Sequence, residues 1–149
     1  MKKLLVLLLL SASVPTFAAG LDFLFESFCY KSPKVQNRNG VFYLPNQQEP
    51  FTGENLCAFV NGQYHSKGNI VNGVADGKWT YWHENGQMWN ERNYKDGRYH
   101  GKQTAWHENG QMSGEGKYIN GKIDGKWIEW DKNGLVNWVG TYKDGKCIS

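Results

Sequence analysis

Glycine recurs along this chain at a constant interval of 24 residues. Three columns keep the interval through four successive repeats, without an insertion. A fixed period of this length indicates an array in which one structural unit stacks on the next. The columns are Gly53, Gly77, Gly101 and Gly125; Asn61-Gly62, Asn85-Gly86, Asn109-Gly110 and Asn133-Gly134; and Gly73, Gly97, Gly121 and Gly145.

Each unit has the pattern of a β-hairpin. Asn-Gly between two alternating apolar-polar runs favours a type I′ turn, in which both central residues have positive φ. We therefore expect residues 78–84 to pair with residues 87–93 around Asn85-Gly86. In this register Gly77 lies opposite Tyr94, and we expect the tyrosine ring to cover the glycine. The same reasoning pairs Gly101 with Tyr118, Gly125 with Tyr142 and Trp127 with Gly140, and makes Gly62, Gly86, Gly110 and Gly134 the turn glycines.

A single hairpin is marginally stable in water, so the units must join into one sheet. The predicted fold class is all-β: a single-layer antiparallel meander or solenoid of stacked 24-residue hairpins with a short N-terminal cap. We place a signal peptide at residues 1–19, the cap and lead-in at 20–50, and the repeats at 51–149. The repeat bounds are about 53–76, 77–100, 101–124 and 125–147.

The N-terminus has the features of a secretory signal peptide. Lys2 and Lys3 precede an apolar run of 11 residues, from Leu4 to Val14, and Pro15 ends that run. The run is shorter than the roughly 20 residues of a membrane-spanning helix. Thr16 and Ala18 suit cleavage after Ala18. The alternative is an N-terminal core helix. We expect an exported protein, periplasmic or secreted.

Charge and composition exclude two classes of protein. Without Lys2 and Lys3, 15 basic residues face 14 acidic ones, with both signs interspersed. A nucleic-acid partner would require a clear basic excess, so we expect no nucleic-acid binding. Aromatic residues make up 15% of the chain, which supplies the apolar surface that disordered chains lack.

Several segments resemble the bacterial variant of the MORN repeat. They are Gly77 to Gly86 followed by Tyr94 to Gly97, and the equivalent segments that begin at Gly101 and at Gly125. The lead-in from Asn39 to Gly53 resembles that of the YwqK-type antitoxin family, which carries such repeats. The resemblance covers roughly residues 39–147. It implies a scaffold that binds a protein partner, with an antitoxin-like or immunity-like role. Gln103, Ala105 and Arg92 depart from the repeat pattern.

Strand alternation gives the sheet two faces. We expect one, the aromatic face, to be the self-covered core side, and the other, the polar face, to carry charged residues around a tryptophan column. The expected aromatic face holds Trp79, Tyr81, Met88, Tyr94, Met112, Tyr118, Trp127, Val136, Trp138 and Tyr142. The expected polar face holds Lys78, Thr80, Trp82, Glu84, Lys102, Thr104, Trp106, Glu108, Lys126, Ile128, Trp130 and Lys132.

Trp82, Trp106 and Trp130 form that column, about 10 Å apart. One interpretation is structural, because tryptophan suits strands and shields its neighbours. The other is a row of rings that binds a protein partner, since tryptophan is enriched at binding hot spots. A further alternative is a module that stacks on envelope glycans or contacts lipid headgroups. The near-neutral charge gives anionic lipid little attraction.

We predict that the protein is not an enzyme. His83 and His107 share a repeat column, which separates them by about 10 Å, too far to ligate one metal. No nucleophile elbow or phosphate-binding loop is present in the sequence. We therefore expect no catalytic residue, no metal site and no cofactor.

The chain has three cysteines, Cys29, Cys57 and Cys147, in no metal-binding spacing. In an oxidising compartment we expect one disulfide. Cys57 and Cys147 lie nearly four repeats apart, beyond the reach of a bridge, whereas Cys29 in the cap is next to the first repeat. We predict a Cys29–Cys57 bridge, with Cys147 free or cross-linking two chains.

The last predicted strand, Leu135 to Tyr142, has no following repeat and contains no charge or proline. An edge of this kind invites strand addition, so we predict a partner site there, with a homodimer as one form of it. Trp138 stands where the other repeats have Ser66, Asn90 and Gly114. It binds a partner or caps the core at the end of the stack.

Overall fold

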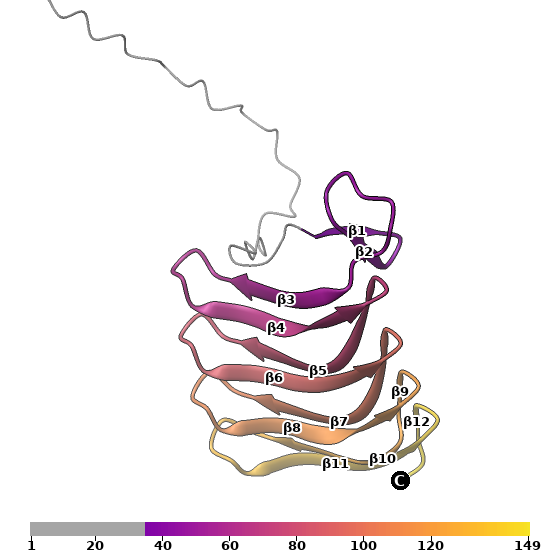
Figure 1. Ribbon diagram of the computed structural model, residues 1–149. Helices are drawn as coiled ribbons and strands as arrows, with labels where there is room; N and C mark the ends of the chain where they lie inside the picture. The colour runs from indigo at the N-terminus through magenta and orange to yellow at the C-terminus, as the bar shows by residue number, and fades with distance from the viewer. Residues whose placement is uncertain (1–34) are drawn as a thin grey trace, which may run out of the picture.

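The computed structural model describes residues 35–149 as two antiparallel sheets, one of two strands and one of ten. Figure 1 shows the larger sheet as a ladder of strands with the lead-in hairpin at one end and the C-terminus at the other. The strands are β1 (Gln36–Arg38), β2 (Val41–Tyr43), β3 (Gly53–Ala58), β4 (Tyr64–Val71), β5 (Val74–Trp82), β6 (Met88–Lys95), β7 (Arg98–Trp106), β8 (Met112–Ile119), β9 (Lys122–Ile123), β10 (Gly125–Trp130), β11 (Val136–Lys143) and β12 (Lys146–Cys147).

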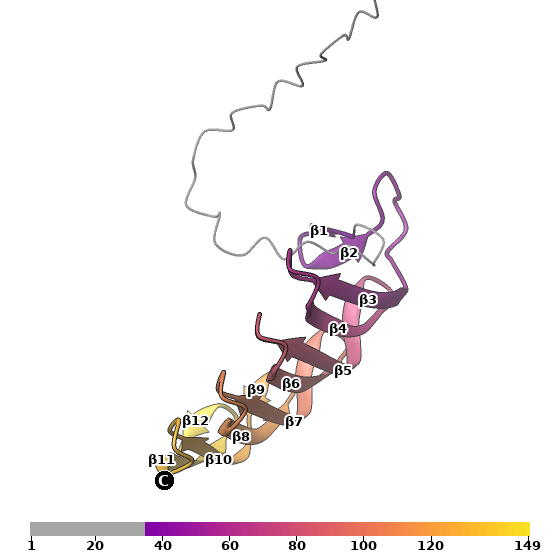
Figure 2. The ribbon, with the colours of Figure 1, turned by 90° about the vertical axis from the view of Figure 1, so that its left-hand side faces the viewer.

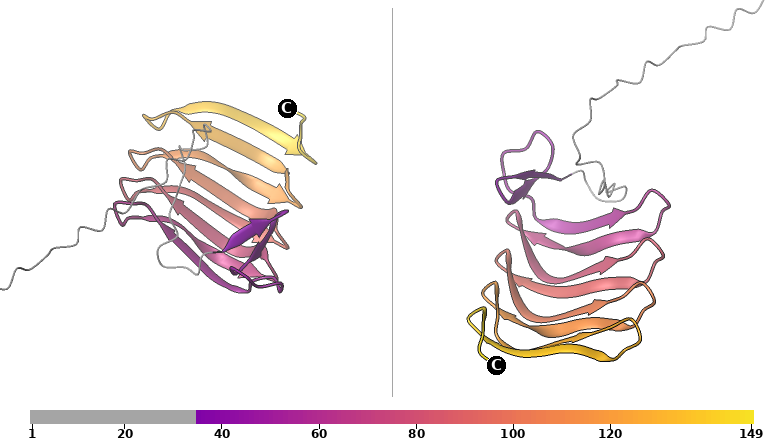
Figure 3. Two further views of the ribbon diagram at one scale, coloured as in Figure 1. Left: turned by 90° about the horizontal axis from the view of Figure 1, so that it is seen from above. Right: turned by 180° about the vertical axis from the view of Figure 1, so that it is seen from behind.

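The ten-stranded sheet follows the chain order, as the 24-residue repeat predicted. Its path is β12-β11-β10-β8-β7-β6-β5-β4-β3, and the short β9 pairs with β8 beside this path. Figures 2 and 3 show a single twisted layer, and no second layer covers it within residues 35–149. The predicted fold class, an all-β antiparallel meander of stacked hairpins, is confirmed.

The two-residue type I′ turns lie at the opposite end of the strands from the one predicted. Asn72 and Gly73 have φ of 49° and 78°, and they separate the paired residues Val71 and Val74. Asp96-Gly97, Asn120-Gly121 and Asp144-Gly145 repeat this turn, with both φ values positive. Such turns match the right-handed twist of the flanking strands. These links between successive hairpins are therefore the tightest turns of the sheet.

The predicted type I′ turn at Asn85-Gly86 is wrong. Only Gly86 has positive φ, at 84°, and its N–H donates to the His83 carbonyl at 2.9 Å. The N–H of His83 donates in turn to the Gln87 carbonyl at 2.8 Å. This is a three-residue loop in which a β-turn is followed by a left-handed glycine. Gly62, Gly110 and Gly134 close the other tips in the same way.

A β-bulge beside each tip corrects the register. Trp82 pairs with Met88, whereas Tyr81 pairs with Asn90, so Trp89 is the extra residue. The three-residue loop shifts the pairing next to the tip by one residue, and the bulge shifts it back. The predicted pairs farther from the tip are therefore confirmed: Gly77–Tyr94, Gly101–Tyr118, Gly125–Tyr142 and Trp127–Gly140.

The bulge also moves three side chains to the other face. Met88, Met112 and Val136 are the direct partners of Trp82, Trp106 and Trp130, and direct cross-strand partners share a face. Their predicted place on the aromatic face is therefore wrong: they lie on the polar face beside the tryptophan column.

Aromatic rings cover different glycines from those predicted. An added Cβ on Gly77 or Gly125 would meet nothing within 4 Å, because positive φ turns it away from the ring of its partner. On Gly68 and Gly116, which have ordinary φ, it would collide with the indole rings of Trp79 and Trp127. Each ring thus lies over a glycine of the preceding hairpin and ties one repeat to the next.

The lead-in hairpin of β1 and β2 docks against the first type I′ turn. The N–H of Phe42 donates to the Gly73 carbonyl at 2.7 Å, and the N–H of Gly73 donates to the Phe51 carbonyl at 2.7 Å. Gly73 has positive φ, and a Cβ there would collide with Val41. Residues 35–50 therefore cover one corner of the first repeat, in the region predicted as cap and lead-in.

Candidate functional site: the polar face and the C-terminal edge

Tyrosine rings form a continuous row along the aromatic face. Tyr94 and Tyr99 have ring centroids 5.0 Å apart, and Tyr99 and Tyr118 have centroids 5.2 Å apart. The hydroxyls of Tyr81 and Tyr94 lie 3.3 Å apart. Burial is the main reason that the pKa values of Tyr81, Tyr94 and Tyr118 are raised. The aromatic side chains of this face therefore pack against one another.

Arg92 is held inside that row. Its Nε donates to the Asn90 side-chain oxygen and its Nη1 donates to the Tyr99 hydroxyl, each at 2.6 Å. The guanidinium carbon lies 5.1 Å from the ring centroids of both Tyr81 and Tyr99. Cation–π contact and hydrogen bonds together hold the charge on a half-buried face.

The polar face carries an apolar strip close to the hairpin tips. Each tryptophan of the predicted column has an apolar direct partner across its hairpin. The three tryptophans are half-buried, whereas Val136 is 60% exposed. Tyr64 extends the strip at its N-terminal end, with its ring centroid 5.9 Å from that of Trp82. We call these seven residues the apolar strip: Tyr64, Trp82, Met88, Trp106, Met112, Trp130 and Val136.

The strip is larger than the tryptophan column that alternation predicted. Tyr64, Met88, Met112 and Val136 were missed as site residues, because alternation without a bulge assigns the last three to the other face. A local signal was present, since an apolar residue stands two positions after each glycine of the tips.

Hydrogen bonds hold the tips of successive repeats together under this strip. The Nε2 of His83 donates to the Trp106 carbonyl at 3.1 Å, and the Nε2 of His107 donates to the Trp130 carbonyl at 2.9 Å. The two histidines therefore bond forward to the backbone beneath the tryptophan column.

Asparagines make a second line of bonds between the tips. Asn85 donates to the Glu108 carbonyl and Asn109 to the Lys132 carbonyl, both at 2.8 Å. Asn61 begins this line with a bond of 3.2 Å to the Glu84 carbonyl. Each tip is thereby fixed to the tip of the following repeat.

Asp131 ends the histidine column at the last repeat. Its Oδ1 accepts the backbone N–H groups of Leu135 and Asn133, each at 2.9 Å. These two bonds, with Leu135 the larger cause, lower the pKa of the Asp131 carboxyl. Asp131 occupies the same repeat position as His83 and His107, but it bonds within its own loop, whereas the two histidines bond to the following repeat.

The outer edge of β11 is covered over part of its length. β12 pairs only with Tyr142 and Lys143, and the N–H of Thr141 donates to the Ser149 carbonyl at 2.7 Å. Within the described chain no strand pairs with the outer edge of residues 136–140. The exposed apolar side chains here are Leu135, Val136, Trp138, Val139 and Ile148.

Trp138 folds back along its own strand. A Cβ on Gly140 would collide with the Trp138 ring. In the preceding repeats the tryptophan of the next hairpin covers this glycine column at Gly68 and Gly116. Trp138 thus supplies from within β11 the cover that a following repeat would bring, while 36% of its surface stays exposed.

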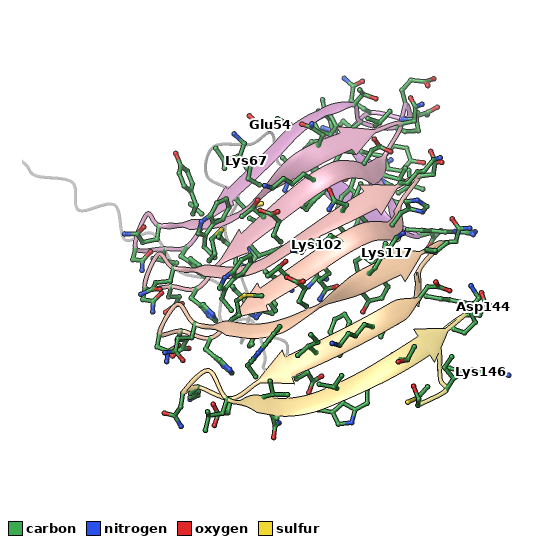
Figure 4. All side chains as sticks on the ribbon, turned by 90° about the horizontal axis from the view of Figure 1, so that it is seen from below. Glu54, Lys67, Lys102, Lys117, Asp144 and Lys146 are labelled. Carbon is green, nitrogen blue, oxygen red and sulfur yellow. The ribbon has the colours of Figure 1, made fainter. Side chains whose placement is uncertain are left out.

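Lysine–glutamate pairs also cross the polar face, which Figure 4 displays. Lys67 bonds Glu54 at 2.9 Å, and the same two positions pair one and two repeats later with the charges exchanged. The later pairs are Lys78–Glu91 at 2.6 Å and Lys102–Glu115 at 2.8 Å. Side chains on both sides of each pair are exposed or half-exposed, so each contributes little to stability.

Two of the cysteines can be placed. Cys57 is buried and disulfide-bonded, and Cys147 is exposed and free. Cys29, its predicted partner, lies outside the described residues, as does the predicted signal peptide. The Cys29–Cys57 pairing stays a prediction.

In the described part of the chain, no group of three or more histidine, cysteine or acidic side chains is arranged to hold a metal ion. Residues 35–149 also contain no helix of the length and apolarity needed to cross a membrane.

Comparison with protein families agrees with this geometry. The model of the MORN repeat variant matches residues 75–96 and 99–120. Each match runs from the start of a hairpin's first strand to the type I′ turn that follows its second strand. A search of the curated proteins found no match. The centre of this sheet is thus built of MORN repeat variants, at residues 75–96 and 99–120.

Proposed function

We propose that this protein is an exported repeat scaffold that binds a protein partner through the polar face. MORN repeats are often involved in membrane or protein binding. The observation that carries the proposal is the apolar strip, which crosses the sheet from β4 to β11 on a face that also carries the lysine–glutamate pairs. An apolar, tryptophan-rich band within a polar surround has the composition of the core of an interface.

The edge of β11 extends this surface. Val136 belongs to both the strip and the open edge, so one partner can contact the side chains of the strip and add a strand to β11. A second copy of the chain meets no charge repulsion there, because residues 135–142 carry no charge. The antitoxin-like or immunity-like role implied by the family resemblance is the specific form of the proposal.

The test compares matched tryptophan variants. Trp106→Thr removes the centre of the strip. Trp89→Ser is the control, since Trp89 is 44% exposed but contacts Tyr81 and His83 on the other side of the bulge. We expect Trp106→Thr to lose a bound envelope protein that the wild type and Trp89→Ser both retain at equal folded fraction. Equal retention by all three proteins would contradict the proposal.

Trp138→Ser distinguishes the two possible roles of Trp138, which are to cap the core and to bind a partner. A purely capping role predicts a lower melting temperature with unchanged association. A partner role predicts weaker association at matched folded fraction, measured by sedimentation for the homodimer and by capture for the envelope partner.

Glycan binding through the tryptophans is the competing function. It predicts that purified cell-wall material retains the chain and that Trp106→Thr and Trp130→Thr abolish retention. Export is tested separately, by fractionating cells that express the full chain and sequencing the N-terminus of the product. A product that begins at Met1 in the cytoplasm would contradict the predicted signal peptide.

A further inference from the structure

Three lysines from adjacent strands form a row on the polar face. Lys102 on β7 is the direct cross-strand partner of Lys117 on β8, and Figure 4 labels both side chains. Lys126 on β10 lines the same surface hollow as these two lysines, and the pairing shifts register before it, since the Asp124 N–H donates to the Lys117 carbonyl at 2.9 Å. Like charges directly opposite one another destabilise a sheet. The Lys102–Lys117 pair therefore costs the fold stability unless an anion offsets it.

The nearby carboxylates form an ion pair with only one of the three lysines. Glu115 is bonded to Lys102 at 2.8 Å, and Asp124 is bonded to Lys143 at 2.9 Å. The Lys143 hydrogen bond is the main cause of the lowered pKa of Asp124, and the charge of Lys117 is a minor one. Among the described residues, Lys117 and Lys126 form no ion pair.

Lys117 is also a departure from the repeat. One repeat earlier the same column holds Asn93, whose side-chain Nδ2 donates to the Lys102 carbonyl at 2.9 Å, and two repeats earlier it holds Asn69. Asparagine thus suits the column and adds a bond between strands. The repeat therefore does not require a lysine at position 117 for its packing.

The three lysines line one hollow. β8 pairs with β10 at Gly114 and Glu115 and with β9 at Tyr118 and Ile119, and the register shifts between these two segments. A hollow of about 450 Å³ lies there. It is lined by Lys102, Glu115, Gly116, Lys117, Lys126 and Ile128.

We propose that this hollow binds a polyanion that carries two or more phosphate groups. Lysine ammonium groups are compact charges that suit phosphate oxygens, and charge-assisted hydrogen bonds to them are strong. Lysines about 5 Å apart on adjacent strands match a ligand with several anionic groups better than a single carboxylate. The site lies on the polar face but is distinct from the apolar strip, so it stands apart from the proposed protein-binding function.

The test uses inorganic triphosphate as the soluble probe and phosphatidylcholine vesicles containing phosphatidic acid as the lipid probe. Lys117→Asn restores the residue of the preceding repeats. Lys78→Gln removes one lysine of the same face, outside the hollow, and is the control for net charge. We expect Lys117→Asn to weaken binding about tenfold and Lys78→Gln to leave it within about twofold.

Thermal unfolding gives a second readout. Without ligand, Lys117→Asn should melt at or above the wild-type temperature, because it relieves the repulsion with Lys102. Triphosphate should raise the melting temperature of the wild type and not that of Lys117→Asn. The probe that binds identifies whether the phosphate source is soluble or a lipid headgroup. Equal losses in the two lysine variants, or no binding to either probe, would overturn the proposal.

Discussion

Arg92 and Gln103 are direct cross-strand partners at the one junction where the repeat lacks both its glycine and its tryptophan. At the neighbouring junctions Trp79 covers Gly68 and Trp127 covers Gly116. The guanidinium between Tyr81 and Tyr99 fills the place that a tryptophan ring occupies elsewhere. The two departures from the repeat are therefore one compensated change.

This relationship predicts coupled mutations. Arg92→Gly removes the guanidinium and its bonds to Asn90 and Tyr99, and Gln103→Trp places an indole against Arg92, so each alone should destabilise the fold. The double variant restores the glycine–tryptophan pair of the other junctions. We expect a favourable coupling energy of about 1–3 kcal/mol from urea unfolding of the four proteins. Additive losses would refute the compensation.

Replacement by alanine should change the stability of the fold differently at two glycines of β8. A Cβ on Gly116 collides with the Trp127 ring, so Gly116→Ala should cost about 1–3 kcal/mol. Gly114 is buried on the same face, but its nearest contact would be 3.7 Å away. Gly114→Ala should be neutral or stabilise by about 0.5 kcal/mol, by reducing the entropy of the unfolded chain. Denaturant midpoints measure both changes, and similar losses would contradict the role of Trp127 as a cover for Gly116.

The contribution of the tip asparagines to stability should differ between the repeats. Asn109→Ala loses the bond to the Lys132 carbonyl and the bond from the Gln111 N–H, for a cost of about 1–2 kcal/mol. Asn133→Ala should cost less, since the hydrogen bond from the Asn133 side chain goes to Asp131, in its own loop, at 3.5 Å. Hydrogen exchange of the tip amides, with urea unfolding, checks the order of the two variants.

The tyrosine row predicts loss of stability at alkaline pH. Burial raises the pKa values of Tyr81, Tyr94 and Tyr118 in the folded chain, whereas unfolded tyrosines ionise near pH 10. The unfolded chain thus releases protons first, and the stabilisation, fully present below about pH 10, is lost as the pH rises above it. Tyr94→Phe should make urea unfolding less dependent on pH between about pH 9 and about pH 11. An unchanged dependence would show that Tyr94 does not contribute.

The disulfide prediction concerns the cap. Cys57→Ser should lower stability by about 3 kcal/mol in the oxidised protein, and Cys147→Ser should not change it. Peptide mapping without reduction should recover a Cys29–Cys57 bridge. A bridge within one chain that includes Cys147 would refute the predicted pairing.

The spacing of the glycine columns is sufficient to predict the class of fold and the register of the strand bodies. It cannot distinguish the observed tips from the predicted ones. A two-residue turn at Asn85-Gly86 and a three-residue loop followed by a bulge at Trp89 both pair Gly77 with Tyr94. The two tips place Met88 on opposite faces, so the tryptophans of the apolar strip were predicted on the correct face and their partners were not. The covers over Gly68 and Gly116 were missed because they join neighbouring repeats, outside the single hairpin from which the register was derived.

The forward direction of the bonds between the tips governs how a chain of this kind changes in length. His83, Asn85, His107 and Asn109 each donate to the next repeat, and only the last repeat satisfies itself, through Asp131 and Trp138. A copy of residues 77–124 inserted after residue 124 therefore finds partners on both sides, because its Trp79 meets Gly116 as Trp127 does. A repeat appended after β11 finds fewer partners, because Asp131 cannot donate forward and Trp138 already covers Gly140. Duplication within the array, with the final unit kept last, is the route by which the sheet can lengthen without losing the self-satisfied contacts of Asp131 and Trp138.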